Sequence, residues 1–390
     1  MRLNTFVKLV LAIIIVGAGA LLTFGPAAVE KSMNTVEAHE PYNISPEAQA
    51  LHDSLIIGDW HADSLLWNRN LLERADRGHV DIPRLQDGNV ALQMFTTVTK
   101  SPAGQNYEEN EADARDNITP LAIAQLWPIS TWNSLLERAL YQSERLHKYA
   151  AKAPDDLKII KTQSDLNALL DARAAGARTV GGLLGTEGAH PLEGKIENLE
   201  KLDQAGFRMI SLQHFFNNEA GGSLHGHENE DLSDFGREVV AQVEARNMVL
   251  DVSHSSEQVV RDVLEMTDMP IVVSHTGIFS HCESKRNIPD DLVSAIAAKG
   301  GVIAIGYWKD VTCDDSPLGV AKTIVAAIDL VGVDHVALGS DFDGSVHTAM
   351  DTSELAAITQ GLLDLEVPEA DIRKVMGDNM VRVLRDRLAP

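Results

Sequence analysis

Histidine and carboxylate residues end several short apolar stretches of this chain. Each stretch is rich in branched aliphatic residues, and the polar residue follows at or just after its end. The residues in this position are His61, Asp63, Glu187, His214, His254, His275 and Asp341. Imidazole and carboxylate groups are the ligands that zinc and similar divalent ions prefer. Brought together, these side chains would form a site for metal-assisted hydrolysis.

Two metal ions could be held by three of the histidines and two of the acidic residues. We expect the ligands to be His61, Asp63, Glu187, His254 and His275. His61 and Asp63 are two residues apart, so they point to the same side of an extended backbone. Glu187 follows an intermediate stretch and is placed to bridge the ions. We therefore predict two Zn²⁺ ions per chain, with a hydroxide between them that attacks a carbonyl carbon.

Each of these residues alone has a simpler interpretation, because a single histidine after a strand is commonly a hydrogen-bonded structural group. Burial of the whole set without partners would cost several kcal/mol per residue, which metal coordination offsets. The set therefore favours a metal site. By contrast, His225 and His227 stand in the polar stretch "LHGHENED" and are expected in a solvated loop. No G-x-S-x-G element indicates a serine hydrolase.

Arg286 stands in "ESKRNIPDD", after the sixth apolar stretch. A guanidinium group is a planar fork that pairs with a carboxylate through two hydrogen bonds. Its place beside the predicted metal site indicates that it binds the free C-terminus of a substrate. An ion pair with Asp290 or Asp291 is equally consistent with the sequence.

The apolar stretches alternate with helical segments and predict a closed barrel. Eight stretches have the length and composition of buried strands. They are Leu55–Gly58, Val90–Val98, Val180–Leu184, Met209–Leu212, Met248–Val252, Ile271–Ser274, Val302–Gly306 and His335–Gly339. Eight β/α units favour a (β/α)₈ TIM barrel over an open sheet. The C-terminal ends of its strands form one face, where residues distant in sequence become neighbours.

Helical spacing occupies the segments between the strands. Val239, Val240 and Val243 lie on one helix face. Ser255 and Gln258 form a capping-box pattern, so we expect a helix directly after His254. The long interval from Thr99 to Arg178 is predicted to be a helical insertion after the second strand. It is not expected to be a separate domain.

The composition is that of a globular protein with an acidic surface. The 390 residues are 44% hydrophobic and 23% charged, and the formal net charge is −24. Such a charge opposes binding to nucleic acids, because their phosphates would be repelled. Two cysteines, Cys282 and Cys313, are too few to indicate a redox compartment by number alone.

The N-terminal segment differs from the rest of the chain. Arg2 and Lys8 precede a charge-free stretch, Leu9–Val29, which as a helix is about as long as a bilayer core is thick. We expect residues 1–29 to be an anchor or a cleaved signal peptide, with a buried helix as the alternative. Residues 30–45 are predicted to be a linker and residues 46–390 the barrel domain.

Several motifs resemble the membrane (renal) dipeptidase family of zinc peptidases, which belongs to the amidohydrolase-like TIM-barrel group. The similar segments are "DWHAD", "GTEGAHPL", "LQHFFNNEAGG", "LSDFGREVV", "LDVSHSS", "PIVVSHTGIFSHCESKRNIPDD", "HVALGSDFDG" and "GDNMVRVL". Their order and spacing are preserved from about Ser54 to Leu384, although the Thr99–Arg178 interval has no clear match.

The resemblance implies specific roles for the residues at the strand ends. His61 and Asp63 would hold the first metal, His254 and His275 the second, and Glu187 would bridge them. The resemblance further implies three roles at the substrate. His214 would bind the carbonyl oxygen, Arg286 would bind the C-terminal carboxylate, and Asp341 would transfer the proton. It also implies a disulfide between Cys282 and Cys313. Phe215 and Phe216 replace a more polar segment of relatives, so the preferred substrate can differ.

We therefore predict an exported dipeptidase that acts on small dipeptides, including those with a C-terminal D-amino acid. It would be anchored in the inner membrane with its domain outside the cytoplasm, or periplasmic or secreted if the N-terminal segment is cleaved. A homodimer is left open. The alternatives are a metal-dependent deacylase or β-lactam hydrolase on the same site, and a non-catalytic anchored peptide-binding protein.

Overall fold

The computed structural model describes residues 2–390, apart from the side chains of residues 2–5, 14, 15, 18 and 21. Eight parallel strands form the central sheet of the protein. They are β2 (Ile57–Ala62), β3 (Val90–Val98), β5 (Val180–Glu187), β6 (Phe207–Ser211), β7 (Val249–Asp251), β8 (Val272–Thr276), β9 (Val302–Ile305) and β10 (Val336–Leu338). Each overlaps one of the eight stretches predicted from the sequence.

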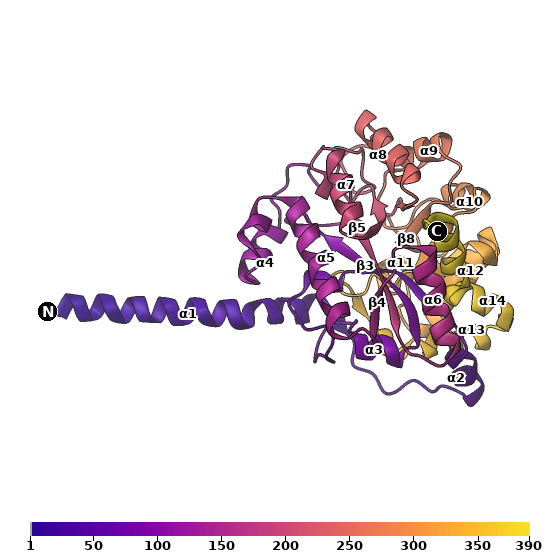
Figure 1. Ribbon diagram of the computed structural model, residues 1–390, viewed down its shortest axis with the longest axis horizontal. Helices are drawn as coiled ribbons and strands as arrows, with labels where there is room; N and C mark the ends of the chain where they lie inside the picture. Colours follow the sequence, from indigo (N-terminus) through magenta and orange to yellow (C-terminus); the bar gives the residue numbers. More distant parts are fainter. Residues whose placement is uncertain (1) are drawn as a thin grey trace.

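The sheet closes on itself. Every strand pairs with the next along the chain, β3 pairs directly with β5, and β10 returns to pair with β2. All these pairings are parallel. Figure 1 shows the strands at the centre and the helices around them. The predicted (β/α)₈ TIM barrel is confirmed.

Helices connect the strands and cover the outside of the barrel. They are α2 (Pro46–Asp53), α3 (Ile82–Asp87), α4 (Ile118–Ala124), α5 (Leu135–Lys152), α6 (Gln163–Ala174), α7 (Glu197–Gln204), α8 (Asp234–Ala245), α9 (Glu257–Met266), α10 (Asp290–Ala298), α11 (Lys309–Thr312), α12 (Pro317–Val331), α13 (Ala356–Asp364), α14 (Glu369–Arg373) and α15 (Asn379–Arg387). The interval between β3 and β5 holds α4, α5 and α6, as predicted, together with a short strand, β4 (Leu157–Ile159), that pairs with β5.

Side-chain caps define where several helices begin. Ser233 accepts a hydrogen bond from the Gly236 N–H at the start of α8, and Val239, Val240 and Val243 of that helix are buried. The start predicted for α9 was one residue too early. Its cap is Ser256, since the Ser255 hydroxyl instead bonds to Gln213 at 2.6 Å. Tertiary contacts thus decide which of two adjacent serines caps the helix.

The hydrophobic core has two layers. One layer lies between the barrel and the helices, and includes Ile57, Phe95 and Val240. The other takes a residue from every barrel strand. Its strand members are Trp60, Ala91, Leu92, Met94, Leu183, Met209, Val249, Val272, Val302, Ala304 and Ala337. Residues from eight strands can share one cluster only inside the barrel, so the interior is packed and not a channel.

Helix α1 (Arg2–Met33) precedes the barrel and extends away from it toward the left of Figure 1. Across the part of the chain that the structure describes, no helix combines the length and apolar character needed to cross a membrane. The membrane anchor predicted for residues 1–29 therefore stays a prediction.

The residues that follow the projecting part of α1 contact the barrel closely. Glu30 is buried, and β1 (Thr35–Val36) pairs with β11 (His347–Thr348) in the loop after β10. The Asn34 side chain accepts a hydrogen bond from the Ser345 N–H at 2.8 Å. This part of the predicted linker is therefore packed on the loop that follows Asp341.

Candidate metal centre

Four histidine side chains converge on one carboxylate oxygen at the C-terminal end of the barrel. The Nε2 atoms of His61, His214, His254 and His275 lie 3.5, 3.3, 3.4 and 3.6 Å from Oε1 of Glu187. All five residues are buried. They come from β2, β5, β8 and the loops after β6 and β7, so only closure of the barrel could bring them together.

These distances do not describe ordinary hydrogen bonds. Donor and acceptor atoms of an N–H···O bond normally lie 2.7–3.2 Å apart. His61 Nε2 is buried and has no hydrogen-bond partner among the described residues. Buried nitrogens that face a carboxylate at longer range fit a ligand set for a cation better than a hydrogen-bonded network.

The ligand atoms fall into two groups that share Glu187. Atoms within each group lie within 4.8 Å of one another. One group is His61, Glu187, His275 and Asp341, and the other is Glu187, His214 and His254. The donor set of imidazoles and carboxylates suits divalent metal ions, so the residues present fit the metal expected from the sequence.

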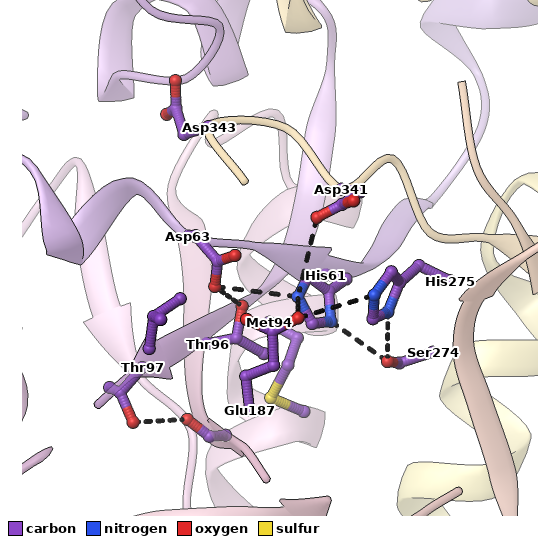
Figure 2. A network of polar contacts seen from close by, with 12 residues as sticks. His61, Asp63, Met94, Thr96, Thr97, Glu187, Ser274, His275, Asp341 and Asp343 are labelled. Atoms are coloured by element: carbon purple, nitrogen blue, oxygen red, sulfur yellow. Dashed lines mark hydrogen bonds and ion pairs between the residues drawn. The ribbon is translucent and has the colours of Figure 1, made fainter. Parts of the chain in front are cut away.

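Asp63 lies at the edge of this cluster and belongs to neither group. Its Oδ1 atom is 3.6 Å from His61 Nε2 and accepts a hydrogen bond of 2.6 Å from Thr96. Figure 2 shows Asp63 and Asp341 on either side of His61. Asp343, although only two residues from Asp341, faces away and pairs with Arg69.

A second layer of polar residues orients two of the imidazoles. The Ser274 hydroxyl lies 3.0 Å from His61 Nδ1 and 2.9 Å from His275 Nδ1. It also donates to Asp251 at 2.7 Å. These contacts leave the Nε2 atoms of both histidines directed at Glu187. Such outer partners commonly fix the ring orientation of metal-binding histidines.

The pKa values of Glu187, His254 and His275 are shifted toward the forms that bind metal. Burial opposes ionisation of Glu187, but the imidazoles around it, His214 first, hold its pKa well below its usual range. Burial, with the Arg286 charge nearby, lowers the pKa values of His254 and His275. An ionised carboxylate and neutral imidazoles are the forms that bind metal. His61 differs, because Asp63 and Glu187 outweigh burial and raise its pKa well above its usual range, so it must release a proton when a metal ion binds. Burial also raises the pKa of Asp341 well above its usual range.

Unusual backbone conformations place several of these side chains. His254 and Asp341 adopt left-handed φ angles of 61° and 59°, which non-glycine residues seldom adopt. Gly188, next to Glu187, has φ +81°, and a Cβ there would lie 2.4 Å from the His190 ring. Strained residues of this kind cluster at functional sites, where the surrounding structure enforces them.

Arg286 lies beside the histidines and does not pair with Asp290 or Asp291. Its Nη2 donates to the His275 carbonyl at 2.9 Å and lies 3.2 Å from His254 Nε2. Nη1 is buried and has no hydrogen-bond partner among the described residues. The guanidinium group therefore presents a free donor next to the cluster, while Asp291 binds Arg261 instead.

The prediction of a solvated loop was wrong for His225. Its side chain is buried, with its ring centroid 5.0 Å from that of Phe215 and 5.2 Å from that of His254. Its Nδ1 lies 3.0 Å from the Tyr107 carbonyl oxygen. The polar neighbours of His225 in sequence hid this burial, because the insertion that covers it is distant in sequence. His227 is exposed, as expected.

A cavity of about 610 Å³ opens from one side of the cluster. Asp63, Glu187 and His214 line its inner end. Its walls come from α1, α4, the end of β3 and the loops after β2, β3 and β10. The apolar wall residues are Pro26, Val29, Met33, Leu66, Trp67, Val98, Ile118, Pro120, Leu121 and Ala124. The sequence did not indicate that residues of α1 would lie here.

A disulfide joins Cys282 to Cys313, as the resemblance implied. It links the loop after β8, which carries Arg286, to the end of α11. The Asn287 side chain donates to the Cys282 and Val311 carbonyls at 2.9 and 3.1 Å, which ties the same two segments together. The loop that presents Arg286 is thus held at both ends.

A sequence model of the membrane dipeptidase family, peptidase family M19, matches residues 45–389. The chain belongs to this family. Dipeptidase aclJ of Aspergillus oryzae is 28% identical to it over 351 residues, which cover 85% of this chain and 78% of the relative. The family predicted from the sequence motifs is confirmed.

Two solved structures share the fold. The probable dipeptidase PvdM of Pseudomonas aeruginosa superposes with a TM-score of 0.70 at 18% identity, covering 87% of this chain and 98% of that chain. A metallopeptidase of Rhodobacter sphaeroides was solved with a phosphinate mimic of the dipeptide L-Ala-D-Ala. It superposes with a TM-score of 0.66 at 22% identity, covering 85% of this chain and 99% of that chain. As a member of the family, the chain is a metal-dependent dipeptidase.

Sequence reasoning did not find the supporting residues of this dipeptidase site. Ser274 and Asp251 orient the histidines, and Asp59 accepts hydrogen bonds from the His61 and Ser340 N–H groups at 2.9 and 3.1 Å. The sequence contained one weak sign of these residues, the position of each aspartate two residues before another polar residue. Asp59 stands two residues before His61. Asp251 stands two residues before Ser253 and accepts a hydrogen bond of 2.9 Å from its N–H.

Proposed function

We propose that this dipeptidase binds two zinc ions at the mouth of the barrel. His61 and Asp63 would hold one ion, and Glu187 would bridge it to the other. His254 and His275 would hold this second ion, since their Nε2 atoms lie 3.0 Å apart, and the His275 nitrogen is also within reach of the His61 group. The observation that carries the proposal is the convergence of four imidazole Nε2 atoms at 3.3–3.6 Å from Glu187 Oε1. Asp341 belongs to the same ligand group as His61, so it can also approach the ion that His61 holds.

When bound, the ions would supply an acidified water and polarise the peptide carbonyl. The remaining steps fall to side chains of the chain itself. His214 lines the cavity and would hydrogen-bond the carbonyl oxygen as negative charge develops on it. Asp341 would accept the proton of the attacking water and return it to the leaving amine. Burial raises the pKa of Asp341 well above its usual range, so this carboxylate binds a proton more readily than an exposed aspartate does.

Arg286 would bind the C-terminal carboxylate of the dipeptide. Its unpartnered, buried Nη1 donor supports this role, because a carboxylate would satisfy it. The Trp308 ring lies 5.5 Å from the guanidinium carbon and keeps the group in place. Trp308 is in turn fixed by a hydrogen bond of 3.0 Å to the Tyr107 hydroxyl.

Metal quantification together with a kinetic panel tests this function. The panel should contain L,L- and L,D-dipeptides, N-acyl amino acids and a β-lactam. We expect two zinc ions per chain and the highest kcat/KM on dipeptides. A preference for N-acyl amino acids or the β-lactam would favour the deacylase or lactamase alternative. Less than one ion per chain and no hydrolysis would favour a peptide-binding protein.

The proposal also includes export, an anchor or signal at the N-terminus, and a homodimer. The Cys282–Cys313 disulfide supports an oxidising compartment outside the cytoplasm. Fractionation of cells, with N-terminal sequencing of the mature protein, distinguishes an anchor in residues 1–29 from a cleaved signal. Sedimentation equilibrium tests the homodimer.

A further inference from the structure

The cavity beside the metal cluster is lined by residues other than Arg286. Its inner end is formed by Asp63, Glu187 and His214, whereas Arg286 contacts His254 and the His275 carbonyl and does not line it. If Arg286 binds the carboxylate of a dipeptide whose scissile bond lies over the cluster, the cavity receives the amino-terminal side. This step rests on the proposed function.

The cavity is large and apolar. A volume of about 610 Å³ lies within the 300–1,000 Å³ range of pockets that hold drug-sized ligands. Among its described lining residues, Asp63, Glu187 and His214 at the inner end are the ones with ionisable side chains. The other polar lining residues carry no charge, and they are Ser101, Gln105, Asn117 and Ser345. A charged group farther from the cluster would therefore lose water without gaining an oppositely charged partner.

Helix α1 contributes one wall of this cavity. Gly25, Val29 and Met33 are four residues apart, so they share one face of the helix, and all three line the cavity together with Pro26. Ile118, Leu121 and Ala124 of the insertion also line the cavity. The substrate pocket is therefore completed by a segment outside the barrel and outside residues 45–389, which match the family.

A chain of buried ion pairs holds this wall in position. Glu30, on the adjacent face of α1, pairs with Arg69 through one oxygen and with Arg77 at 2.8 Å through the other. Arg69 also pairs with Asp343, which accepts hydrogen bonds from Ser64 at 2.6 Å and the His79 N–H at 2.7 Å. The wall is thus joined to the loop that carries Asp341.

We propose that α1 determines the substrate specificity of this enzyme through Val29 and Met33. The preferred substrates carry a bulky apolar group on the amino-terminal side of the scissile bond, such as a leucine or phenylalanine residue. Small or charged residues in that position are poor substrates, because they leave the cavity unfilled or bury a charge without a partner.

Hydrolysis of dipeptides that differ only in the amino-terminal residue tests this proposal. The series is Gly-Ala, Ser-Ala, Leu-Ala, Phe-Ala and Lys-Ala, with the full chain and its bound metal. We expect kcat/KM for Phe-Ala to exceed that for Gly-Ala at least about tenfold. Val29→Glu and Met33→Glu should each lower that ratio about tenfold and raise the relative rate on Lys-Ala, because a carboxylate then faces the substrate.

The matched control is Ile129→Glu, which makes the same kind of change in the insertion at a side chain that is 73% exposed and does not line the cavity. Its ratio of kcat/KM for Phe-Ala to kcat/KM for Gly-Ala should equal that of the wild type. Equal hydrolysis of the whole series, or unchanged ratios in both cavity variants, would overturn the proposal and leave the dipeptidase function intact. Hydrolysis of none of the series by metal-loaded protein would overturn the proposed function as well.

Discussion

The Nε2 atoms of His254 and His275 lie 3.0 Å apart at the mouth of the barrel. His254 follows β7, His275 stands near the end of the neighbouring strand β8, and both nitrogens also face Glu187. Two imidazole nitrogens directed at one point share a single proton at most, or they bind a common cation. Because both nitrogens also face Glu187, replacement of this carboxylate tests whether the cluster binds metal.

Replacement of Glu187 by alanine should remove metal and activity together. Both proposed ions share this ligand, so we expect fewer than one ion per chain and a fall in kcat of at least about a thousandfold. Elemental analysis and dipeptide hydrolysis on the same sample measure the two effects. Glu238→Ala, on the exposed face of α8, is the control and should keep both. Full activity with two ions in Glu187→Ala would rule out the bridging role.

Arg286→Met should weaken substrate binding through the lost carboxylate contact. A hydrogen bond to a charged group contributes about 1.5–3 kcal/mol, so kcat/KM should fall roughly 10- to 100-fold for a dipeptide. The comparison substrate is the corresponding dipeptide amide, which carries no carboxylate. The variant should hydrolyse the amide about as well as the wild type does. An equal loss on both substrates would show that Arg286 acts on the cluster instead.

Arg69→Met should destabilise the fold, because it leaves the carboxylates of Glu30 and Asp343 buried without their common partner. Removal of one member of a buried pair typically costs about 3–5 kcal/mol. Urea unfolding measures the change in the free energy of unfolding. Arg74→Met is the control, since its pair with Asp87 is exposed and should contribute at most about 1 kcal/mol. Equal costs for both variants would contradict the structural role of Arg69.

His52 should make the fold less stable in acid. One of its ring nitrogens lies 2.9 Å from the Thr359 hydroxyl. Burial lowers the pKa of His52 from 6.5 to about 4, and the contact of its other ring nitrogen with the Gly88 carbonyl at 3.2 Å offsets part of this effect. Between these two pH values the unfolded chain binds more protons than the folded one. The stability gained from the neutral form is therefore present above pH 6.5 and is lost as the pH falls to about 4.

The loss amounts to about 3 kcal/mol for a shift of this size. Guanidinium unfolding of the wild type and His52→Gln between pH 4 and pH 8 measures it. The stability difference between the two proteins should shrink as the pH falls, with pH 8 as the reference at which the histidine is neutral in both states. A difference that is constant with pH would refute the assignment.

Reduction of the Cys282–Cys313 disulfide should lower stability. The two cysteines are 31 residues apart, and closing a loop of this length stabilises a fold by about 3–4 kcal/mol in the chain-entropy model. Thermal unfolding with and without reductant measures the effect, and the double variant Cys282→Ser/Cys313→Ser should match the reduced protein. Thiol titration in denaturant without reductant should detect no free thiol; two thiols per chain would contradict the bridge.

Much of the barrel and its rim was predictable because each strand is locally encoded. A run such as "PIVVSH" is apolar on both faces, so it can only be a strand buried on both sides, and His275 at its end must lie at the rim. The same reasoning applies to His61 and Glu187. The alternation with helices then left few arrangements other than a closed barrel.

Other features could not be predicted because they depend on contacts between distant segments. Ser255 and Ser256 are equivalent as caps in the sequence, and Gln213 decides between them. His225 is buried only because Tyr107 and Phe215 pack around it. The β4 strand is three residues long and exists because β5 offers it an edge.

The amino-acid sequence by itself determined which side chains could bind metal and at which strand ends they stand, because strand periodicity and ligand chemistry are local properties. The tertiary structure alone decided that four imidazoles meet at one oxygen of Glu187, and that Asp343 turns away to Arg69. It alone placed Val29 and Met33 beside the cluster. Such neighbours arise when a closed sheet and a buried ion pair bring together residues that nothing in the sequence links.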